Sequence, residues 1–406
     1  MAGLLDGIRV IEIATYVFMP GAGTVMADFG AEVIHVEPPG YGDPYRALYR
    51  MKPLPQSDEN YCWEMDSRNK KSLVLDLKSE LGRQVIFDLV KDIDVLITNF
   101  HPSVLTDLHI TYETLSEINP RLIYAHGTGY GESGEEVEKP GYDATAWWAR
   151  TGLMDAVRPA GGDMGISTPG MGDHPSSMTA FGGIALALYA RERTGKGTKI
   201  STSLLANGAW SNSLLIQAAL CGSTTYIPPT QSDTTNAVVN HYQCSDGRSL
   251  FLVLIKESEE FAKFCNAIER PDIAEDPRFA ELGNRRENSV VLAGVLSEWF
   301  VRRPLAEWRE ILDENAITFG DIATYEETVV DQQMIQNGIF VEFADQPGKK
   351  TVSSPLELRG FPKRQPIAPP TLGQHTTEIL RDLGYDEAHI AELLATNVVQ
   401  VGLKKD

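Results

Sequence analysis

Residues 8–37 read IRVIEIATYVFMPGAGTVMADFGAEVIHVE, and three elements follow one another closely in this stretch. Ile8–Ala14 is an apolar run that predicts a buried strand, and Ala31–Glu37 predicts a second one. Between them, Pro20–Gly30 predicts a short helix that opens with proline and closes with glycine. A strand, a helix and a strand in this order are typical of a parallel sheet covered by helices.

The same alternation continues along the chain and extends the predicted α/β sheet. Further strands are expected at Val95–Asn99, Leu122–Gly127 and Thr198–Ser203, and further helices at Ser79–Lys91, Thr111–Ile118, Ser176–Arg193 and about Leu204 to Leu220. We therefore predict an α/β fold with a large parallel-sheet domain.

A change of composition marks a second, smaller domain. Residues 222–235 are rich in Ser, Thr and Pro and predict a linker, and a hairpin is expected at His241–Lys256. A second loop-rich stretch with many prolines covers residues 345–370. The predicted division is residues 1–221 for the large domain, 222–235 for the linker, 236–320 for a small α+β domain, and 321–406 for a linker and a C-terminal segment that returns to the large domain.

The charge balance restricts the partners. The 406 residues contain 36 Lys and Arg against 56 Asp and Glu, a formal net charge of −20, which excludes a protein that follows nucleic-acid phosphates. The four cysteines form no C-x-x-C pair, so neither a metal site nor a redox motif is indicated, and scattered thiols fit a reducing compartment. The sequence contains no run of 18 apolar residues, so no membrane span is predicted. We expect a cytoplasmic protein without nucleic-acid or membrane partners.

The turn after the first strand contains Gly21 and Gly23, but Met26 stands where a dinucleotide fingerprint needs a third glycine. Glu37 lies near the place of a ribose-binding acid. A G-x-G pattern alone is a weak signal, and the favoured interpretation is a tight helix start that packs closely on the sheet.

Arg68-Asn69-Lys70-Lys71 is the densest basic cluster of this acidic chain. A phosphate site requires such a local reversal of charge, whereas most charge clusters are solvated surface runs. The cluster alone leaves both interpretations open.

The sequence Gly170-Met171-Gly172-Asp173-His174-Pro175 precedes a long apolar helix. Asp173 is either an exposed nucleophile whose helix N-terminus offers N–H groups to an oxyanion, or an ordinary N-cap, and the residues alone favour the N-cap. His126 and His174 are the histidines nearest to this candidate chemistry, and no metal-ligand spacing involves them. Trp147, Trp148 and Arg150 could wall an acyl pocket, with a core role favoured for at least one tryptophan.

Taken together, several segments resemble the class III CoA-transferases, the group of formyl-CoA:oxalate and carnitine CoA-transferases. The strongest is Gly172-Asp173 followed by the helix and Arg193-Thr194-Gly195-Lys196-Gly197. The others are Leu5–Ala14, Gly30–Asp43, Asn69–Lys78, Asn99–Phe100, Gly129–Gly131 and Leu372–Leu383.

The resemblance implies a chemistry for Asp173 that reverses the preference for an N-cap. Its carboxylate would attack an acyl-CoA, giving an aspartyl anhydride and then an aspartyl-CoA thioester, which an acceptor acid resolves. Coenzyme A is then a substrate, and no covalently bound cofactor or metal is implied. The family fold implies a Rossmann-like large domain made from both chain ends, and an interlocked homodimer.

The resemblance also implies roles for further residues. Asp143 matches an active-site glutamate and Tyr142 a tyrosine beside it, while Val17 stands where the formyl-CoA transferase has a glutamine. The candidate CoA contacts are Val17, Leu75, Lys78, Asn99, Phe100 and Lys139. From their charge, Lys70, Lys71 and Lys78 are the candidates for the CoA phosphates, with Lys78 favoured and Arg46 next.

Departures from the pattern argue against oxalate or formate as a substrate. They are Val17 itself, Asp107 in place of a CoA-binding arginine, and the lack of a glycine-rich flap over Thr230–Asn240. The surroundings of Asp173 resemble instead the branch that acts on 2-hydroxy acids and aryl-lactates. Two alternatives are an acyl-CoA racemase, disfavoured because Tyr142 stands where racemases have histidine, and a CoA-binding protein without catalysis.

Overall fold

The computed structural model describes residues 3–223 and 226–402, and its contacts divide the chain into two compact units. The large unit comprises Met1–Asp155, Ile166–Thr224 and Ile335–Asp406, and the small unit comprises Ala156–Gly165 and Thr225–Met334. The predicted division differs in detail, because it gave residues 156–165 to the large domain and ended the small domain at residue 320. Two residues of the predicted linker, 224 and 225, lie outside the described residues.

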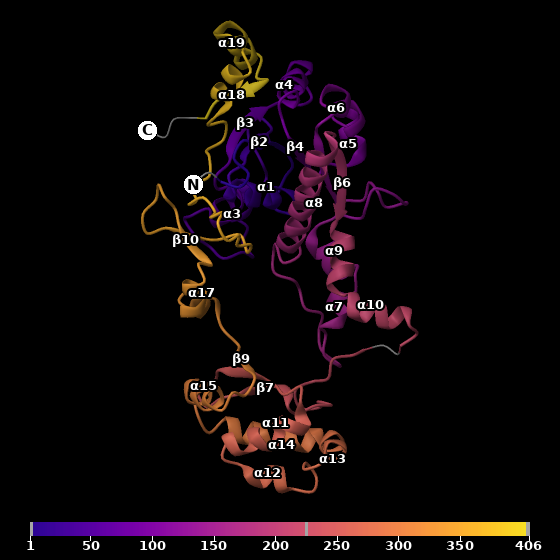
Figure 1. The fold of residues 1–406 in the computed structure, drawn as a ribbon, viewed down its shortest axis with the longest axis vertical. Helices are drawn as coiled ribbons and strands as arrows, with labels where there is room; N and C mark the ends of the chain where they lie inside the picture. The colour runs from indigo at the N-terminus through magenta and orange to yellow at the C-terminus, as the bar shows by residue number, and fades with distance from the viewer. Residues whose placement is uncertain (1–2, 224–225, 403–406) are drawn as a thin grey trace. The chain divides into compact units, whose positions relative to one another are not determined.

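A seven-stranded sheet forms the centre of the large unit, in the order β12-β3-β2-β1-β4-β5-β6. Figure 1 labels β2, β3, β4 and β6 of this sheet. Its strands are β1 (Arg9–Ile13), β2 (Glu32–Glu37), β3 (Lys71–Leu75), β4 (Val95–Thr98), β5 (Ile123–Thr128), β6 (Thr198–Ser203) and β12 (Val399–Gln400). All neighbours pair in parallel except β12, which is antiparallel to β3. The order β3-β2-β1-β4-β5-β6 is that of doubly wound dinucleotide-binding folds, so the predicted parallel α/β sheet is confirmed.

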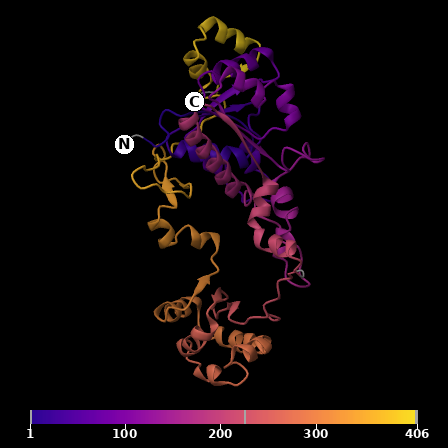
Figure 2. The same ribbon diagram turned by 45° about the vertical axis from the view of Figure 1, so that its right-hand side comes forward.

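Helices cover both faces of this sheet because alternate strand residues point to opposite sides. Val10 of β1 packs with α1 (Phe18–Asp28) and α8 (Asp173–Thr194), while Ile11 packs with helices of the other face. Those helices are α4 (Glu80–Val90), α6 (Tyr112–Ile118), α18 (Thr376–Asp382) and α19 (Glu387–Ala395). The C-terminal helices, yellow in Figures 1 and 2, therefore complete the core of the unit that contains the N-terminus.

The glycines after β1 serve packing between elements. A Cβ at Gly21 would lie 2.4 Å from Ser177 Oγ of α8, and one at Gly23 would lie 2.0 Å from Glu12 Oε2 of β1. The interpretation of this turn as a close-packing helix start is thus confirmed. Helix α1 begins at Phe18 rather than at Pro20, which is tolerated because the first turn has no acceptor for the missing N–H.

The predicted helix from Leu204 to Leu220 is two helices, α9 (Leu204–Ser211) and α10 (Ser213–Leu220). They meet at Asn212, whose side-chain amide donates to the Thr151 carbonyl at 2.9 Å. The remaining elements of the large unit and its borders are α2 (Tyr45–Leu48), α3 (Tyr61–Asp66), α5 (Pro102–Asp107), the π-helix η1 (Asp143–Ala149), α7 (Leu153–Ala156), α17 (Gln332–Gln336), β10 (Phe340–Glu342) and β11 (Lys350–Val352).

The small unit pairs a three-stranded antiparallel sheet with helices around its own apolar core. Its strands are β7 (Val239–Gln243), β8 (Ser249–Val253) and β9 (Phe319–Asp321), and its helices are α11 (Glu257–Ala267), α12 (Pro271–Glu275), α13 (Leu282–Glu287), α14 (Ser289–Phe300), α15 (Leu305–Glu314) and α16 (Tyr325–Thr328). Across both units, no described helix has the length and apolar composition needed to span a membrane.

Candidate active site

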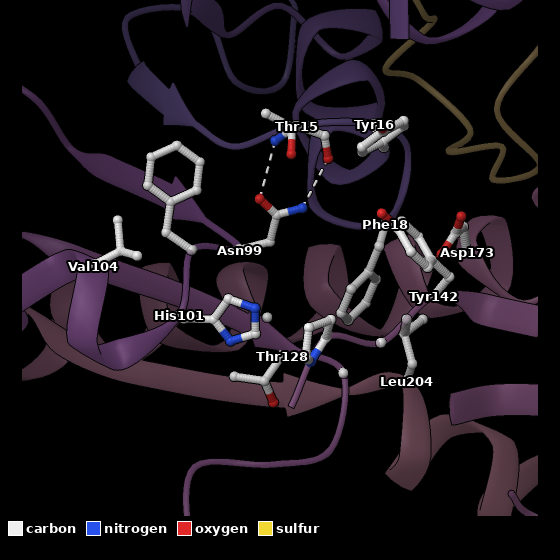
Figure 3. A pocket seen from close by; sticks show the side chains of 15 residues that line it. Thr15, Tyr16, Phe18, Asn99, His101, Val104, Thr128, Tyr142, Asp173 and Leu204 are labelled. Atoms are coloured by element: carbon white, nitrogen blue, oxygen red, sulfur yellow. Dashed lines mark hydrogen bonds between the residues drawn. The ribbon is translucent and has the colours of Figure 1, made fainter. Parts of the chain in front are cut away.

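A pocket of about 380 Å³ lies in the large unit where β1, β4 and β5 end. Strands β1 and β4 are the neighbours at which the order of the sheet reverses, and this is the place where open α/β sheets bind ligands. The lining residues are Thr15, Tyr16, Phe18, Asn99, Phe100, His101, Val104, Gly127, Thr128, Gly129, Pro140, Gly141, Tyr142, Asp173 and Leu204. In Figure 3, Asp173 lies on the same side as Tyr142 and Phe18, with His101 and Val104 on the other side.

Asn99 ties the two strand ends together at the floor of the pocket. Its side-chain oxygen accepts from the Thr15 N–H at 3.0 Å, and its side-chain NH₂ donates to the Thr15 carbonyl at 2.8 Å (Figure 3). The carbonyl of Phe100 lies 2.9 Å from His126 Nε2, and His126 Nδ1 contacts Glu132. Asn99 and Phe100 thus line the pocket, whereas His126 lies behind it as a support for the Phe100 backbone.

Asp173 is the first residue of α8, and the residue before it can only be glycine. A Cβ at Gly172 would lie 2.7 Å from the Trp147 ring, so the backbone packs flat on this tryptophan. The Gly172 N–H donates to Asp143 Oδ2 at 3.3 Å, which fixes the Met171–Gly172 peptide, one residue before Asp173. Trp147 and Trp148 are buried, with a core role, and Arg150 is instead paired with Glu136 on the surface.

The Asp173 carboxyl group lies in an unfavourable place for a negative charge. Burial and, next, the nearby Asp143 carboxylate raise its pKa to about 7; the Asp66 carboxylate adds to this, and His174 opposes it. A carboxyl group in a pocket with a pKa moved this far is a candidate for chemistry rather than for capping. Gly172, which has no side chain, is the N-cap of α8, and Asp173 is the first helical residue, so Asp173 is not the N-cap that the residues alone favoured.

The helix start offers fewer N–H groups to an oxyanion than the sequence predicted. The His174 N–H donates to the Gly170 carbonyl at 3.1 Å, Pro175 has none, and the Ser176 N–H donates to the Gly172 carbonyl at 3.3 Å. The expectation of an oxyanion site built from this turn is therefore wrong for these three residues.

The structure adds one residue that the sequence analysis missed. Asp66, the last residue of α3, is buried, and its Oδ1 lies 3.2 Å from His174 Nε2. Tyr45 donates its hydroxyl proton to Asp66 Oδ2 at 2.6 Å. No sequence motif indicates Asp66, because it lies 108 positions from its partner His174 and ends a helix of only six residues.

The basic cluster at residues 68–71 is engaged in ion pairs. Arg68 binds Asp28 through two hydrogen bonds, and Lys70 binds both Glu12 oxygens at 3.0 and 3.1 Å and the Pro20 carbonyl at 2.7 Å. Both basic side chains are buried. The cluster is thus neither a free phosphate patch nor a solvated run, and the prediction of a basic patch is wrong for Arg68 and Lys70.

Lys71 and Arg46 are also paired with carboxylates. Lys71 contacts Glu378 at 2.8 Å and Glu32, the first residue of β2, at 3.4 Å, so it lies toward the amino ends of the strands and away from the pocket. Arg46 holds both Glu37 oxygens, at 2.6 and 2.7 Å, and stacks on Trp63. Because Glu37 is occupied in this way, it is not available to a ribose.

The other predicted residues fall into two groups. Tyr142 is an exposed wall of the pocket, its ring 6.0 Å from that of Tyr16, and Lys78 is exposed three residues after β3 ends. Val17 and Leu75 are buried and do not line the pocket, while Lys139 pairs with Glu136 at 2.7 Å. The structure thus brings together Asp173, Asp143, Tyr142, Asn99 and Phe100. Among the described residues, no group of three or more His, Cys, Asp or Glu side chains is arranged to hold a metal ion.

Comparisons with known proteins agree with this geometry. The family model described as CoA-transferase family III matches residues 5–376. The chain is 30% identical to the (R)-2-hydroxy-4-methylpentanoate CoA-transferase of Clostridioides difficile over 98% of this chain and 100% of that protein. It is 31% identical to the cinnamoyl-CoA:phenyllactate CoA-transferase of Clostridium sporogenes, over 99% and 98%. The crystal structure of a CAIB/BAIF family protein from Brucella suis superimposes with a TM-score of 0.84 at 26% identity, covering 94% of this chain and 100% of that one.

Proposed function

The chain belongs to CoA-transferase family III, and from this premise we propose that it carries coenzyme A on Asp173 between an acyl-CoA and a free carboxylic acid. The observation that supports this most is the position of Asp173, a carboxyl group at the pocket wall whose surroundings disfavour its charge. When such a carboxylate forms a neutral ester-like bond, the free-energy cost of its buried charge is removed.

The proposed reaction has four balanced steps. The Asp173 carboxylate attacks the thioester carbonyl, the carbon–sulfur bond breaks, and an aspartyl-acyl anhydride and CoA thiolate result. The thiolate attacks the aspartyl carbonyl and releases the donor acid as its carboxylate. The acceptor carboxylate then attacks the carbonyl of the aspartyl-CoA thioester, the carbon–sulfur bond breaks, and a second anhydride and CoA thiolate result. The thiolate attacks the acceptor's carbonyl in this anhydride, which forms the new acyl-CoA and releases the Asp173 carboxylate.

Asp143 and Tyr142 have supporting parts in this proposal. Asp143 accepts a hydrogen bond from the Gly172 N–H and fixes the backbone one residue before Asp173, and its charge raises the pKa of Asp173. A carboxylate with a raised pKa is a stronger nucleophile once it is ionised. Tyr142 closes the pocket beside the nucleophile, together with Tyr16. Asn99 and Phe100 form the floor over which the thioester would lie.

We place the acid substrate among monocarboxylic acids with an apolar body, such as branched or aryl 2-hydroxy acids. Among the 15 described lining residues there is no Lys or Arg to hold a second carboxylate, and His101 is the only basic side chain. The apolar side chains are Tyr16, Phe18, Phe100, Val104, Tyr142 and Leu204. The two relatives named above act on such acids according to their names.

Exchange assays test the function and the substrate class separately. The protein is mixed with an acyl-CoA and a panel of free acids, and new acyl-CoA is measured by mass. Transfer to 4-methyl-2-hydroxypentanoate or phenyllactate at least about tenfold faster than to succinate or glutarate is expected, since a buried second carboxylate without a partner costs over 1.4 kcal/mol. A preference for the dicarboxylates contradicts the substrate class, and no transfer to any acid contradicts the function.

We also propose that two copies of the chain associate. Helices α8, α9 and α10 expose large apolar side chains in the single chain: Leu186 (71% exposed), Trp210 (82%), Leu214 (82%) and Leu220 (77%). A second copy would remove this surface from water. Sedimentation at low concentration should give a dimer, and a stable folded monomer would contradict the interlocked arrangement that the family resemblance implies.

A further inference from the structure

His174 follows the proposed nucleophile directly and is held from two sides. Its Nε2 lies 3.2 Å from Asp66 Oδ1 and its Nδ1 lies 3.0 Å from the carbonyl oxygen of Gly170. Gly170 has φ +79°, and a Cβ at this position would lie 2.9 Å from His174 Cε1. The backbone before α8 is therefore shaped to receive the imidazole ring.

Both ring nitrogens of His174 face oxygen atoms that can only accept. A neutral imidazole carries one N–H and satisfies one of them, whereas the imidazolium ion donates to both. Burial alone would lower the pKa of His174, but the Asp66 carboxylate outweighs it and raises the pKa to about 9. Although 38% of the side chain is exposed, the ring thus carries a positive charge at neutral pH.

We infer that His174 is a positioning residue for Asp173, which fixes the first turn of α8 between Asp66 and Gly170 and places a positive charge beside the nucleophile. The inference rests on the proposed role of Asp173 as the carrier of coenzyme A. It adds a residue whose charge opposes the two neighbouring carboxylates and so keeps enough Asp173 ionised to react.

The groups that face this pair come from several elements. Asp143 (η1) and Asp66 (α3) act on Asp173, while Tyr45 (α2) and Lys70 (before β3) act on Asp66. Of these charges, only those of His174 and Lys70 are positive, and Lys70 is already bound by Glu12. Of the two positive groups, His174 therefore has the more direct electrostatic effect on Asp173.

His174→Gln removes the charge while an amide can still bond to Asp66 or Gly170. Without the imidazolium the pKa of Asp173 rises, so the acidic limb of kcat/KM should move to higher pH. Since each unit of pKa changes the ionised fraction tenfold below the midpoint, kcat/KM at pH 6 should fall about tenfold or more. At pH 9 it should lie within about threefold of the parent, because Asp173 is ionised in both proteins and His174 itself loses its proton there.

The matched control is His389→Gln, which removes an exposed histidine paired with Asp386 on α19 and should leave the pH profile unchanged. An equal loss at pH 6 and pH 9, or no loss at either, would overturn the inference. If Asp173→Ala retains turnover, the proposed function itself is wrong. If Asp173→Ala is inactive and the pH profile of kcat/KM does not shift in His174→Gln, only the inference about His174 is wrong.

A second measurement does not depend on activity or on the folding of His174→Gln. In Asp66→Asn the ring keeps an acceptor oxygen but loses the carboxylate charge. Titration of the His174 ring signals by NMR should give a pKa near 9 in the parent and a value at least about one unit lower in Asp66→Asn. An unchanged titration would show that Asp66 does not hold the charge, and would overturn the inference.

Discussion

Two groups of charged side chains in the large unit differ in their ratio of acids to bases. The Lys70 network (Glu12, His35, Asp43 and Lys70) contains two acids and two bases, all buried. The Asp173 site (Asp66, Asp143, Asp173 and His174) contains three acids and one base, and of these four residues Asp173 lines the pocket. Removal of one partner from a buried ion pair destabilises a fold, whereas like charges held close together shift pKa values, as is common at reactive sites. In the proposed function, the basic residues of the Lys70 network serve the fold and the acids of the Asp173 site serve the reaction.

The largest expected effect comes from removing the proposed nucleophile. Asp173→Ala should lower kcat at least ~1,000-fold, because a covalent step has no substitute group nearby. Its free energy of unfolding at pH 8 should not fall. The folded-state pKa of about 7 lies above the ordinary value of 3.8, so ionisation of Asp173 destabilises the folded protein above that range.

Exchange kinetics and urea unfolding check this prediction. Near-normal turnover of Asp173→Ala would remove Asp173 from the reaction, and a large loss of stability would assign it to the fold, as in the Lys70 network.

A substitution that breaks the Lys70 network should lower the stability of the fold, unlike Asp173→Ala. Lys70→Met leaves Glu12 buried without its ammonium partner and should lower the free energy of unfolding by about 3–5 kcal/mol. The matched control is Lys71→Met, whose partners Glu32 and Glu378 are 38% and 52% exposed, and a change below about 1 kcal/mol is expected. Similar losses in the two variants, measured by urea unfolding, would contradict the distinction between buried and exposed pairs.

The Lys70 network should also make stability depend on pH. Burial opposes the charge of His35, but the Asp43 and Glu12 carboxylates outweigh it and raise its pKa to about 9. A raised folded-state pKa gives stability that is complete below about pH 6.5 and is lost as the pH rises to about 9. For this fully buried ring the loss is about 3 kcal/mol.

Urea unfolding at pH 6.5 and pH 9 measures the loss. His35→Gln should reduce the difference between the two pH values, while His389→Gln should keep it. A full parental difference in His35→Gln would show that other groups cause the pH dependence.

The smallest effect concerns a lysine that belongs to neither group. Lys78 is exposed, and the described residues give its ammonium no carboxylate partner. If it binds a CoA phosphate, Lys78→Ala should raise the KM for acyl-CoA about tenfold and leave kcat nearly unchanged. Lys71→Ala, in which the lysine is already paired, should leave this KM unaltered. Equal KM values in Lys78→Ala and the parent at low salt would place the phosphate site elsewhere.

The sequence was sufficient for the sheet, and it identified Asp173 as the candidate nucleophile. Apolar runs and the glycines at 21 and 23 predicted the order of strands and helices around β1, because periodicity and close packing leave a local signal. Asp173 was recognised through the family resemblance, since its residues alone favoured an N-cap.

Partnerships between distant residues could not be predicted in this way. The cluster at residues 68–71 looks like a free basic patch until the fold brings Asp28 and Glu12 to it. Asp66 carries no motif, and its link to His174 exists only once α3 and the start of α8 meet. A short stretch of sequence shows which charged residues are present, but not which of them are paired with distant residues in the fold.

Covalent trapping tests the role of Asp173 most directly. The protein is incubated with an acyl-CoA without acceptor acid, quenched, and digested for mass spectrometry, with Asp173→Ala as the control. An adduct with the mass of coenzyme A less one water is expected on the peptide that contains Asp173; hydroxylamine should remove it, and the control should lack it. An adduct on another residue, or full turnover without any adduct in the parent protein, would contradict the account.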